Sequence, residues 1–168
     1  HVRSRRQRQM CIRDSTKTMF AARDQFGIKP LYYATTEAGT VFASEMKCIL
    51  EMADEIGLEL NLDRRAIEHY VDLQYVPEPE SLHANIRRVE SGCTVTLRPG
   101  EDVVAERYFK PRFPVQQVKQ GEEQQLFNRI AEALEDSVAK HMRADVTVGS
   151  FLSGGIDSTA IALSLIHI

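Results

Sequence analysis

The feature that most constrains the fold of this chain is a Gly-Gly loop between an apolar segment and a helix-forming segment. The loop has the sequence Ser-Gly-Gly-Ile-Asp-Ser at residues 153–158, and the apolar segment covers 146–152. Glycine has no Cβ atom, so the backbone can turn sharply and bring its N–H groups close to an oxyanion. The positive end of the following helix points to the same place. We therefore expect a buried strand, a pyrophosphate-binding loop and a helix, which together open an α/β domain.

Asp157 indicates that a metal ion accompanies the bound anion. A carboxylate repels a bare phosphate, whereas a divalent cation between the two makes the arrangement favourable, and Mg²⁺ is the usual choice. The loop is not a Walker A loop, because no Lys precedes Ser158. The alternative is an ordinary Gly-Gly turn that a serine caps.

The upstream part of the chain is rich in short strands. Its apolar patterning, with turns at Gly and Pro, predicts strands at 18–24, 31–35, 40–43, 86–89, 93–97 and 103–109. Two short helices are expected between them, at 45–52 with Ser44 as N-cap and at 62–71 with Asp63 as N-cap. A long helix is expected to begin at Glu122.

These patterns divide the chain into a β-rich piece at 16–109, a linker at 110–121 and the start of an α/β domain at 122–163. Residues 1–15 are strongly basic and show no helix or strand period, and residues 164–168 stop in mid-helix without a cap. We interpret both ends as non-native flanking sequence. The alternative for residues 1–15 is a native basic arm.

The composition excludes several kinds of protein. With 43% hydrophobic and 27% charged residues, the chain can bury a core and is not disordered throughout. A formal net charge of -3 argues against nucleic acid as a partner. No apolar run is long enough to span a membrane. Three widely spaced cysteines, Cys11, Cys48 and Cys93, favour a reducing, cytoplasmic setting over disulfides or a zinc site.

Motifs in both pieces resemble one family. The string from His141 to Ser158 resembles the N-type ATP pyrophosphatases, and in particular the glutamine-hydrolysing asparagine synthetases, although Thr147 stands where the family commonly has Pro. The stretch from Arg23 to Tyr33, Arg-Asp-Gln-Phe-Gly-Ile-Lys-Pro-Leu-Tyr-Tyr, is similar to the class II glutaminase domain of the same enzymes. Residues 42–47 and 74–79 are similar too. The motifs therefore come from two domains and occur in the family's order.

The resemblance implies a fold and a set of site residues. The β-rich piece would be α+β, as part of an N-terminal-nucleophile αββα glutaminase. The second piece would begin an adenine-nucleotide α-hydrolase-like α/β domain with a parallel sheet. Asp24 would bind the α-amino group of glutamine, whereas the residues alone also allow Asp24 to pair with Arg23 or to cap its turn. The residues implied to bind the ATP pyrophosphate are Leu152, Ser153, Gly154, Gly155, Asp157 and Ser158, with Asp157 on Mg²⁺.

The resemblance also implies that no catalytic residue is present. The family's nucleophile is an N-terminal Cys followed by Gly. Cys11 is followed by Ile12 and lies too close to Arg23, so we reject it and expect no glutaminase activity from this chain alone. Cys48 and Cys93 are expected to be packed thiols.

The implied parent enzyme is a cytoplasmic ligase that makes asparagine from aspartate, glutamine and ATP. It would proceed through β-aspartyl-AMP and release AMP and pyrophosphate, with Mg²⁺ as the cofactor. Its partners would be these small molecules rather than nucleic acid or a membrane, and a homodimer is left open. The alternatives are an amidotransferase of another carboxylate, of the β-lactam synthetase or cell-envelope amidation type, and a non-catalytic relic.

Overall fold

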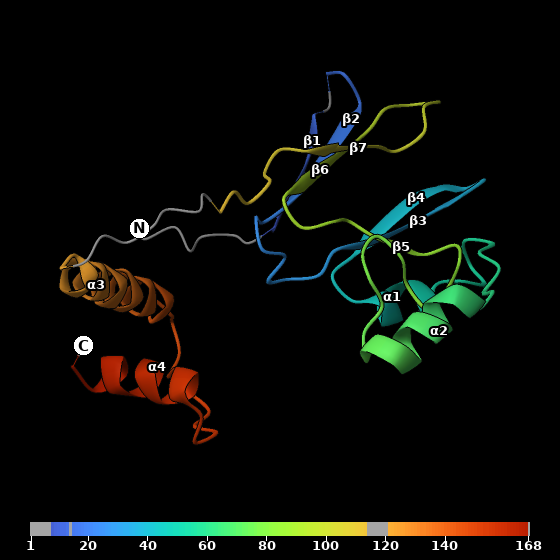
Figure 1. Ribbon diagram of the computed structural model, residues 1–168. Coiled ribbons are helices and arrows are strands. Elements are labelled where there is room, and N and C mark those ends of the chain that lie inside the picture. Colours follow the sequence, from blue (N-terminus) through green and yellow to red (C-terminus); the bar gives the residue numbers. More distant parts are fainter. Residues whose placement is uncertain (1–7, 14, 114–120, 168) are drawn as a thin grey trace. The chain divides into compact units, whose positions relative to one another are not determined.

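The computed structural model describes residues 8–13, 15–113 and 121–167, and these fall into two compact units. One unit, here called the β-rich unit, ends at Arg112, and the other, the helical unit, begins at Phe113. The elements of the β-rich unit are β1 (Arg8–Arg13), β2 (Thr18–Arg23), β3 (Tyr32–Thr36), β4 (Gly39–Ala43), α1 (Met46–Glu51), α2 (Arg64–Leu73), β5 (Arg87–Arg88), β6 (Cys93–Leu97) and β7 (Val104–Arg107) (Figure 1). Those of the helical unit are α3 (Glu123–His141) and α4 (Ile156–His167).

The β-rich unit contains two antiparallel sheets. Sheet A has the strand order β1-β2-β6-β7, and sheet B has the order β4-β3-β5 (Figure 1). Within sheet A, β2 lies between β1 and β6, so that Ala21 is opposite both Met10 and Val95. Although residues 1–15 show no period of their own, Arg8–Arg13 thus pair along the whole of β2. The interpretation of residues 1–15 as flanking sequence stays a prediction.

Successive side chains of β3 and β4 point to opposite faces of sheet B, and this alternation determines how the layers stack. Tyr33 and Phe42 project into a core shared with sheet A, and their rings stack with centroids 5.7 Å apart. Their chain neighbours Ala34 and Val41 face the opposite side of sheet B, where they pack with Ile49 of α1. Sheet B is therefore covered on one face by sheet A and on the other by α1. This order of layers confirms a mixed α/β unit built on antiparallel sheets.

The two helices of this unit begin in different ways. Asp63 caps α2 as expected, because its Oδ1 accepts from the N–H groups of Arg65 (2.9 Å) and Ala66 (3.2 Å). The prediction that Ser44 caps α1 is wrong. The helix begins at Met46, which puts Glu45 at the cap position, and this residue makes no side-chain cap hydrogen bond.

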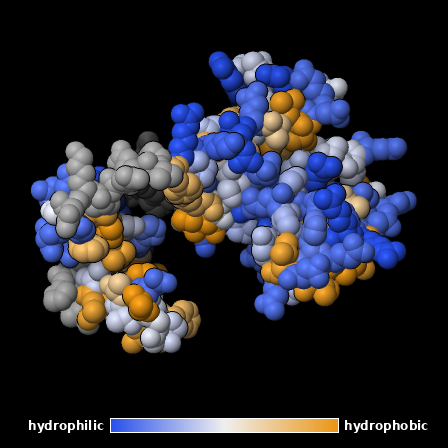
Figure 2. Space-filling model, in the orientation of Figure 1, coloured by the Kyte–Doolittle hydropathy of each residue, from blue (hydrophilic) through white to orange (hydrophobic). Residues whose placement is uncertain are grey.

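In the helical unit, the strand predicted at 146–152 does not form. These residues have no regular structure, and Phe151 is 98% exposed. The reason is that a parallel strand needs neighbours for its backbone groups, and the described part of this unit contains no strand. Figure 2 shows hydrophobic residues on much of its surface, as expected for a unit with little buried core. The parallel-sheet domain implied by the resemblance is thus represented only by two helices and a loop.

The remaining elements follow the patterning closely. Both helices flanking the loop and all the strands expected in the β-rich unit are present within a few residues of their predicted bounds. The expected linker at 110–121 lies largely outside the described residues, since 114–120 are not described. No helix in the described part of the chain is long and apolar enough to cross a membrane.

Ile49→Ala should destabilise the β-rich unit by about 2–5 kcal/mol, because it leaves a cavity between α1 and sheet B where Ile49 is 1% exposed. Urea unfolding followed by tyrosine fluorescence measures this unit alone, since all five tyrosines precede Arg112. Val71→Ala is the control, because Val71 is 72% exposed and its loss should cost under about 0.5 kcal/mol. Equal costs would contradict the assigned layers.

Candidate functional site

A buried arginine ends strand β2. Side chains on one face of a strand recur every second residue, so Arg23 continues the inward-facing series of Met19 and Ala21. Its side chain is 4% exposed. Burial of a guanidinium without partners is strongly unfavourable, so the surrounding chain must supply acceptors for its N–H groups.

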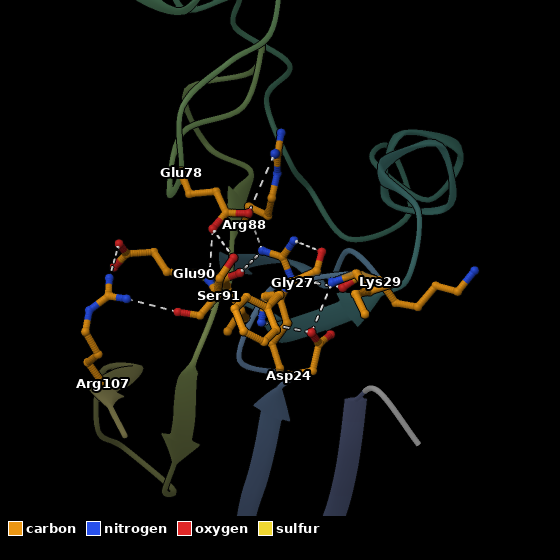
Figure 3. A network of polar contacts seen from close by, with 12 residues as sticks. Asp24, Gly27, Lys29, Glu78, Arg88, Glu90, Ser91 and Arg107 are labelled. Atoms are coloured by element: carbon orange, nitrogen blue, oxygen red, sulfur yellow. Dashed lines mark hydrogen bonds and ion pairs between the residues drawn. The ribbon is translucent and has the colours of Figure 1, made fainter. Parts of the chain in front are cut away.

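Four groups accept hydrogen bonds from Arg23 (Figure 3). Nε donates to the carbonyl of Lys29 at 2.9 Å, and Nη2 donates to the carbonyl of Gly27 at 2.8 Å. Nη1 donates to the carbonyl of Val89 at 2.5 Å and forms an ion pair with Glu78. The hydrogen bonds from the guanidinium to the carbonyls of Gly27 and Lys29 therefore hold the loop at 24–29 in place.

Glu78 balances the charge of Arg23 and also holds a turn of the chain. Its Oε2 accepts from the N–H of Ser91 at 2.9 Å and from the Ser91 hydroxyl at 3.0 Å. Burial raises the pKa of Glu78, but the hydrogen bonds from Ser91 and the Arg23 charge outweigh burial and lower the pKa below 4.5. Glu78 is therefore ionised in the neutral pH range. Arg88 adds a second positive charge 3.9 Å from Oε1 and lies over the ring of Tyr32.

Only one carboxylate oxygen of Asp24 accepts hydrogen bonds from the described residues. Its Oδ1 accepts from the N–H groups of Phe26 and Ile28, both at 3.1 Å. Its Oδ2 is shielded from solvent and has no hydrogen-bond partner among the described residues. Asp24 thus caps its own turn, one of the two alternatives open from the sequence, and Arg23 pairs with Glu78 rather than with Asp24. The unused oxygen suits a cationic donor, because an unpaired buried carboxylate oxygen is costly.

The backbone around Asp24 is fixed from the side of sheet A. Its carbonyl accepts from the N–H of Gly92 at 2.8 Å, and the hydroxyl of Tyr108 donates to the carbonyl of Arg23 at 2.6 Å. Burial and the nearby Asp24 carboxylate raise the pKa of Tyr108. Arg107 adds hydrogen bonds to the turn at 90–92 (Figure 3). The carboxylate of Asp24 therefore stands on a loop with little freedom to move.

The resemblance implies a role for Asp24 but none for the residues that hold it in place. The segment 74–79 resembles the family, yet the resemblance implies no role for Glu78. Ser91 and Tyr108 carried no signal at all, because side chains of this type are common in turns and at strand ends. Lys29 is exposed, and only its carbonyl takes part in the network.

The second predicted site, the loop at 153–158, does lie directly before α4. Gly154 has φ +80°, which only glycine adopts readily, and α4 begins at Ile156. The hydroxyls of Ser153 and Ser158 lie 2.9 Å apart and bond one another. The hydroxyl of Ser158 also donates to the carbonyl of Gly155 at 3.1 Å. The turn and helix start are thus present without the strand expected before them.

The loop offers one carboxylate to a metal ion. Asp157 lies in the first turn of α4 and is exposed, and its carboxylate makes no hydrogen bond or ion pair with the described residues. No group of three His, Cys, Asp or Glu side chains that could hold a metal occurs in the described parts of the chain.

The two cysteines whose side chains are described differ in burial. Burial raises the pKa of the Cys93 thiol, which fits the expected packed thiol. Cys48 is exposed, so the expectation that it is packed is wrong, because it falls on the outer side of the short helix α1. Cys11 lies within β1, where its backbone is opposite Phe20, and nothing further is described of its side chain.

Fold and site define the β-rich unit as a two-sheet α/β domain. It presents the carboxylate of Asp24 with one oxygen hydrogen-bonded and the other without a partner among the described residues. A family model described as a glutamine amidotransferase domain matches residues 9–109, which is more than half of the chain. The chain belongs to this family. A second model, described as asparagine synthase, matches residues 129–167.

Relatives support the same assignment. The chain is 55% identical over 148 residues to a Mycobacterium bovis protein whose name assigns it provisionally to the glutamine-hydrolysing asparagine synthetases, with 88% of this chain and 23% of the relative covered. It is 46% identical over 144 residues to asparagine synthetase (glutamine-hydrolysing) 1 of Bacillus subtilis, with 85% and 22% covered. It is 28% identical over 156 residues to amidase chry2 of Gibberella zeae, with 92% and 22% covered. The chain therefore spans under a quarter of the length of these relatives.

Gly27→Ala should destabilise the β-rich unit more than Gly57→Ala. Both glycines have positive φ, +62° and +65°, so each alanine costs about 1–2 kcal/mol in backbone strain. A Cβ at Gly27 would also clash with Ser91 Oγ and lie 2.6 Å from Arg23 Nη2, whereas Gly57 has open space. We expect a further cost of about 1–3 kcal/mol for Gly27→Ala in urea unfolding. Equal losses of unfolding free energy in the two variants would show that Arg23 and Ser91 do not pack closely against Gly27.

Glu78→Gln should remove a pH-dependent part of the stability. Because the pKa of Glu78 is lowered below 4.5 in the folded chain, the stabilisation is fully present above pH 4.5 and is lost as pH falls through the folded value. The difference in free energy of unfolding between wild type and variant should therefore be largest near neutral pH and shrink in acid. Urea titrations at a series of pH values between about 7 and about 3 test this. A constant difference would contradict it.

Proposed function

We propose that the β-rich unit binds glutamine and that Asp24 receives its α-amino group. The observation that carries this proposal is the unpaired Oδ2 of Asp24, on a loop fixed by Arg23. An ammonium group would supply both the missing hydrogen bond and the opposite charge. Membership of the glutamine amidotransferase domain family supports glutamine as the amine.

We propose that the loop at 153–158 serves the ATP-dependent half of the same enzyme. The N–H groups of Gly154 and Gly155 and the hydroxyls of Ser153 and Ser158 would donate to the β- and γ-phosphate oxygens. The hydroxyls would exchange their present bond to one another for phosphate oxygens. Leu152 would lie against the nucleotide. Asp157 would hold Mg²⁺, which neutralises charge on the departing pyrophosphate.

The parent enzyme is proposed to be a cytoplasmic, glutamine-hydrolysing asparagine synthase, a ligase that forms a C–N bond. Glutamine hydrolysis would supply ammonia, and ATP would activate the carboxylate of aspartate as β-aspartyl-AMP, because a free carboxylate is a very poor acyl donor. Aspartate is favoured over another carboxylate because the relatives at 46–55% identity carry asparagine synthetase names, whereas amidase chry2 is 28% identical. Glutamine, aspartate and ATP would be its partners.

Asp24→Asn should abolish recognition of the α-amino group. Wild-type chain should bind L-glutamine more tightly than 4-carbamoylbutanoate, which is glutamine without that group. A hydrogen bond between charged groups contributes about 1.5–3 kcal/mol, so the preference should be about 10- to 100-fold. Calorimetric titration of both ligands measures it. In Asp24→Asn the two affinities should become equal.

The matched control is Asp102→Asn, because Asp102 is an exposed carboxylate in the turn between β6 and β7. This variant should keep the wild-type preference. A wild-type chain that binds both ligands equally would refute the amine-binding role of Asp24. So would an Asp24→Asn variant that still distinguishes them.

A further inference from the structure

Glu78 reaches the Asp24 loop from a remote part of the sequence. It lies in the connection between α2 and β5, 55 residues beyond Arg23, yet its Oε1 accepts a hydrogen bond from Arg23 Nη1 (Figure 3). The other nitrogens of the same guanidinium hold the carbonyls of Gly27 and Lys29. Through Arg23, Glu78 thus acts on the far end of the loop.

The second oxygen of Glu78 acts on the near end of the loop. Oε2 accepts from both the N–H and the hydroxyl of Ser91. The next residue, Gly92, donates its N–H to the carbonyl of Asp24 at 2.8 Å. One carboxylate therefore connects the group that holds the carbonyl of Asp24 with the group that holds the carbonyls of Gly27 and Lys29.

Charge gives Glu78 a second effect on Asp24. Glu78 is the carboxylate that forms the ion pair with the buried Arg23, and Arg88 places another guanidinium 3.9 Å from it. If Glu78 lost its charge, Arg23 would be left buried without an ionic partner, which is strongly unfavourable. The adjacent residue in the chain, Asp24, carries an unpaired carboxylate oxygen that could take over that role.

We propose that Glu78 is a positioning residue for the amine site: it keeps Arg23 engaged, and so leaves Asp24 Oδ2 free and correctly placed for the substrate ammonium group. This role rests on the glutamine-binding function proposed above. Glu78 itself does not contact glutamine in this arrangement. It acts through Arg23 and Ser91.

The test is Glu78→Gln in the 168-residue chain, with binding of L-glutamine and 4-carbamoylbutanoate measured by calorimetry near neutral pH. At metal sites, loss of a residue that orients a ligating group typically weakens binding at least about tenfold, and we take the same scale for a residue that orients Asp24. We therefore expect glutamine to bind about tenfold more weakly and the analogue without the amino group to bind as before. Glu101→Gln is the control, because it removes the same charge from the exposed pair of Glu101 and Arg98.

A double-mutant cycle separates positioning from general stability. If Glu78 acts through Asp24, then Glu78→Gln should cause no further loss of affinity in the Asp24→Asn background. The proposal would be overturned if the double variant showed an additive loss of affinity. It would also be overturned if Glu78→Gln weakened binding of both ligands equally or left glutamine binding unchanged. Should Glu78→Gln not fold, Ser91→Ala removes only the hydroxyl donor to Oε2 and should give a smaller loss in the same direction.

Backbone amide NMR signals of Phe26 and Ile28 give a readout that needs no ligand, since both amides donate to Asp24 Oδ1. They should shift in Glu78→Gln and stay in place in Glu101→Gln, while the signal of Val95 in β6 stays in place in both. Unmoved signals would overturn the positioning role. If they move while the wild type does not distinguish glutamine from its analogue, the positioning role of Glu78 stands and the amine-binding function fails.

Discussion

The burial of the Arg23 guanidinium is the constraint on which the rest of the β-rich unit depends. The alternation of β2 turns this side chain inward, next to Ala21, where it is 4% exposed. A guanidinium in that position requires acceptors for its N–H groups and a nearby negative charge. The carbonyls at 27, 29 and 89 and the carboxylate of Glu78 supply them. Segments from three parts of the chain are thereby joined around one charge.

This arrangement explains why Asp24 has one free oxygen. Because four N–H groups of Arg23 and its ion pair with Glu78 are engaged elsewhere, Arg23 does not draw Asp24 into an ion pair, and the turn amides occupy only Oδ1. Oδ2 remains shielded and without a partner among the described residues. A carboxylate held in this way is prepared for a cationic ligand, because its position is fixed before binding and little ordering remains to be done.

The two candidate sites differ in how much of their surroundings the described chain supplies. The Asp24 loop connects β2 of sheet A to β3 of sheet B, and these two sheets bury a common core. The loop at 153–158 has its turn and its helix, but the segment before it is exposed and has no strand to pair with in the described part of the helical unit. A Gly-Gly turn and the start of a helix depend on contacts within a few residues. A parallel strand depends on hydrogen bonds to a neighbouring strand, so it cannot form locally.

The sequence by itself determined the local elements. Patterns of period two and 3.6, turn residues and the Asp63 cap act over a few residues, so the elements of the β-rich unit other than β1, both long helices and the Gly-Gly loop could be predicted. Strand β1 could not, because residues 1–15 show no period of their own and Arg8–Arg13 form a strand by pairing with β2. The resemblance also implied a role for Asp24, and that role stays a prediction. The tertiary structure alone decided that Arg23 pairs with Glu78 and that Ser91 completes the network, because these residues are 55 and 13 positions apart from their partners. It also decided that 146–152 stays irregular, since strand formation depends on neighbours that no local pattern encodes.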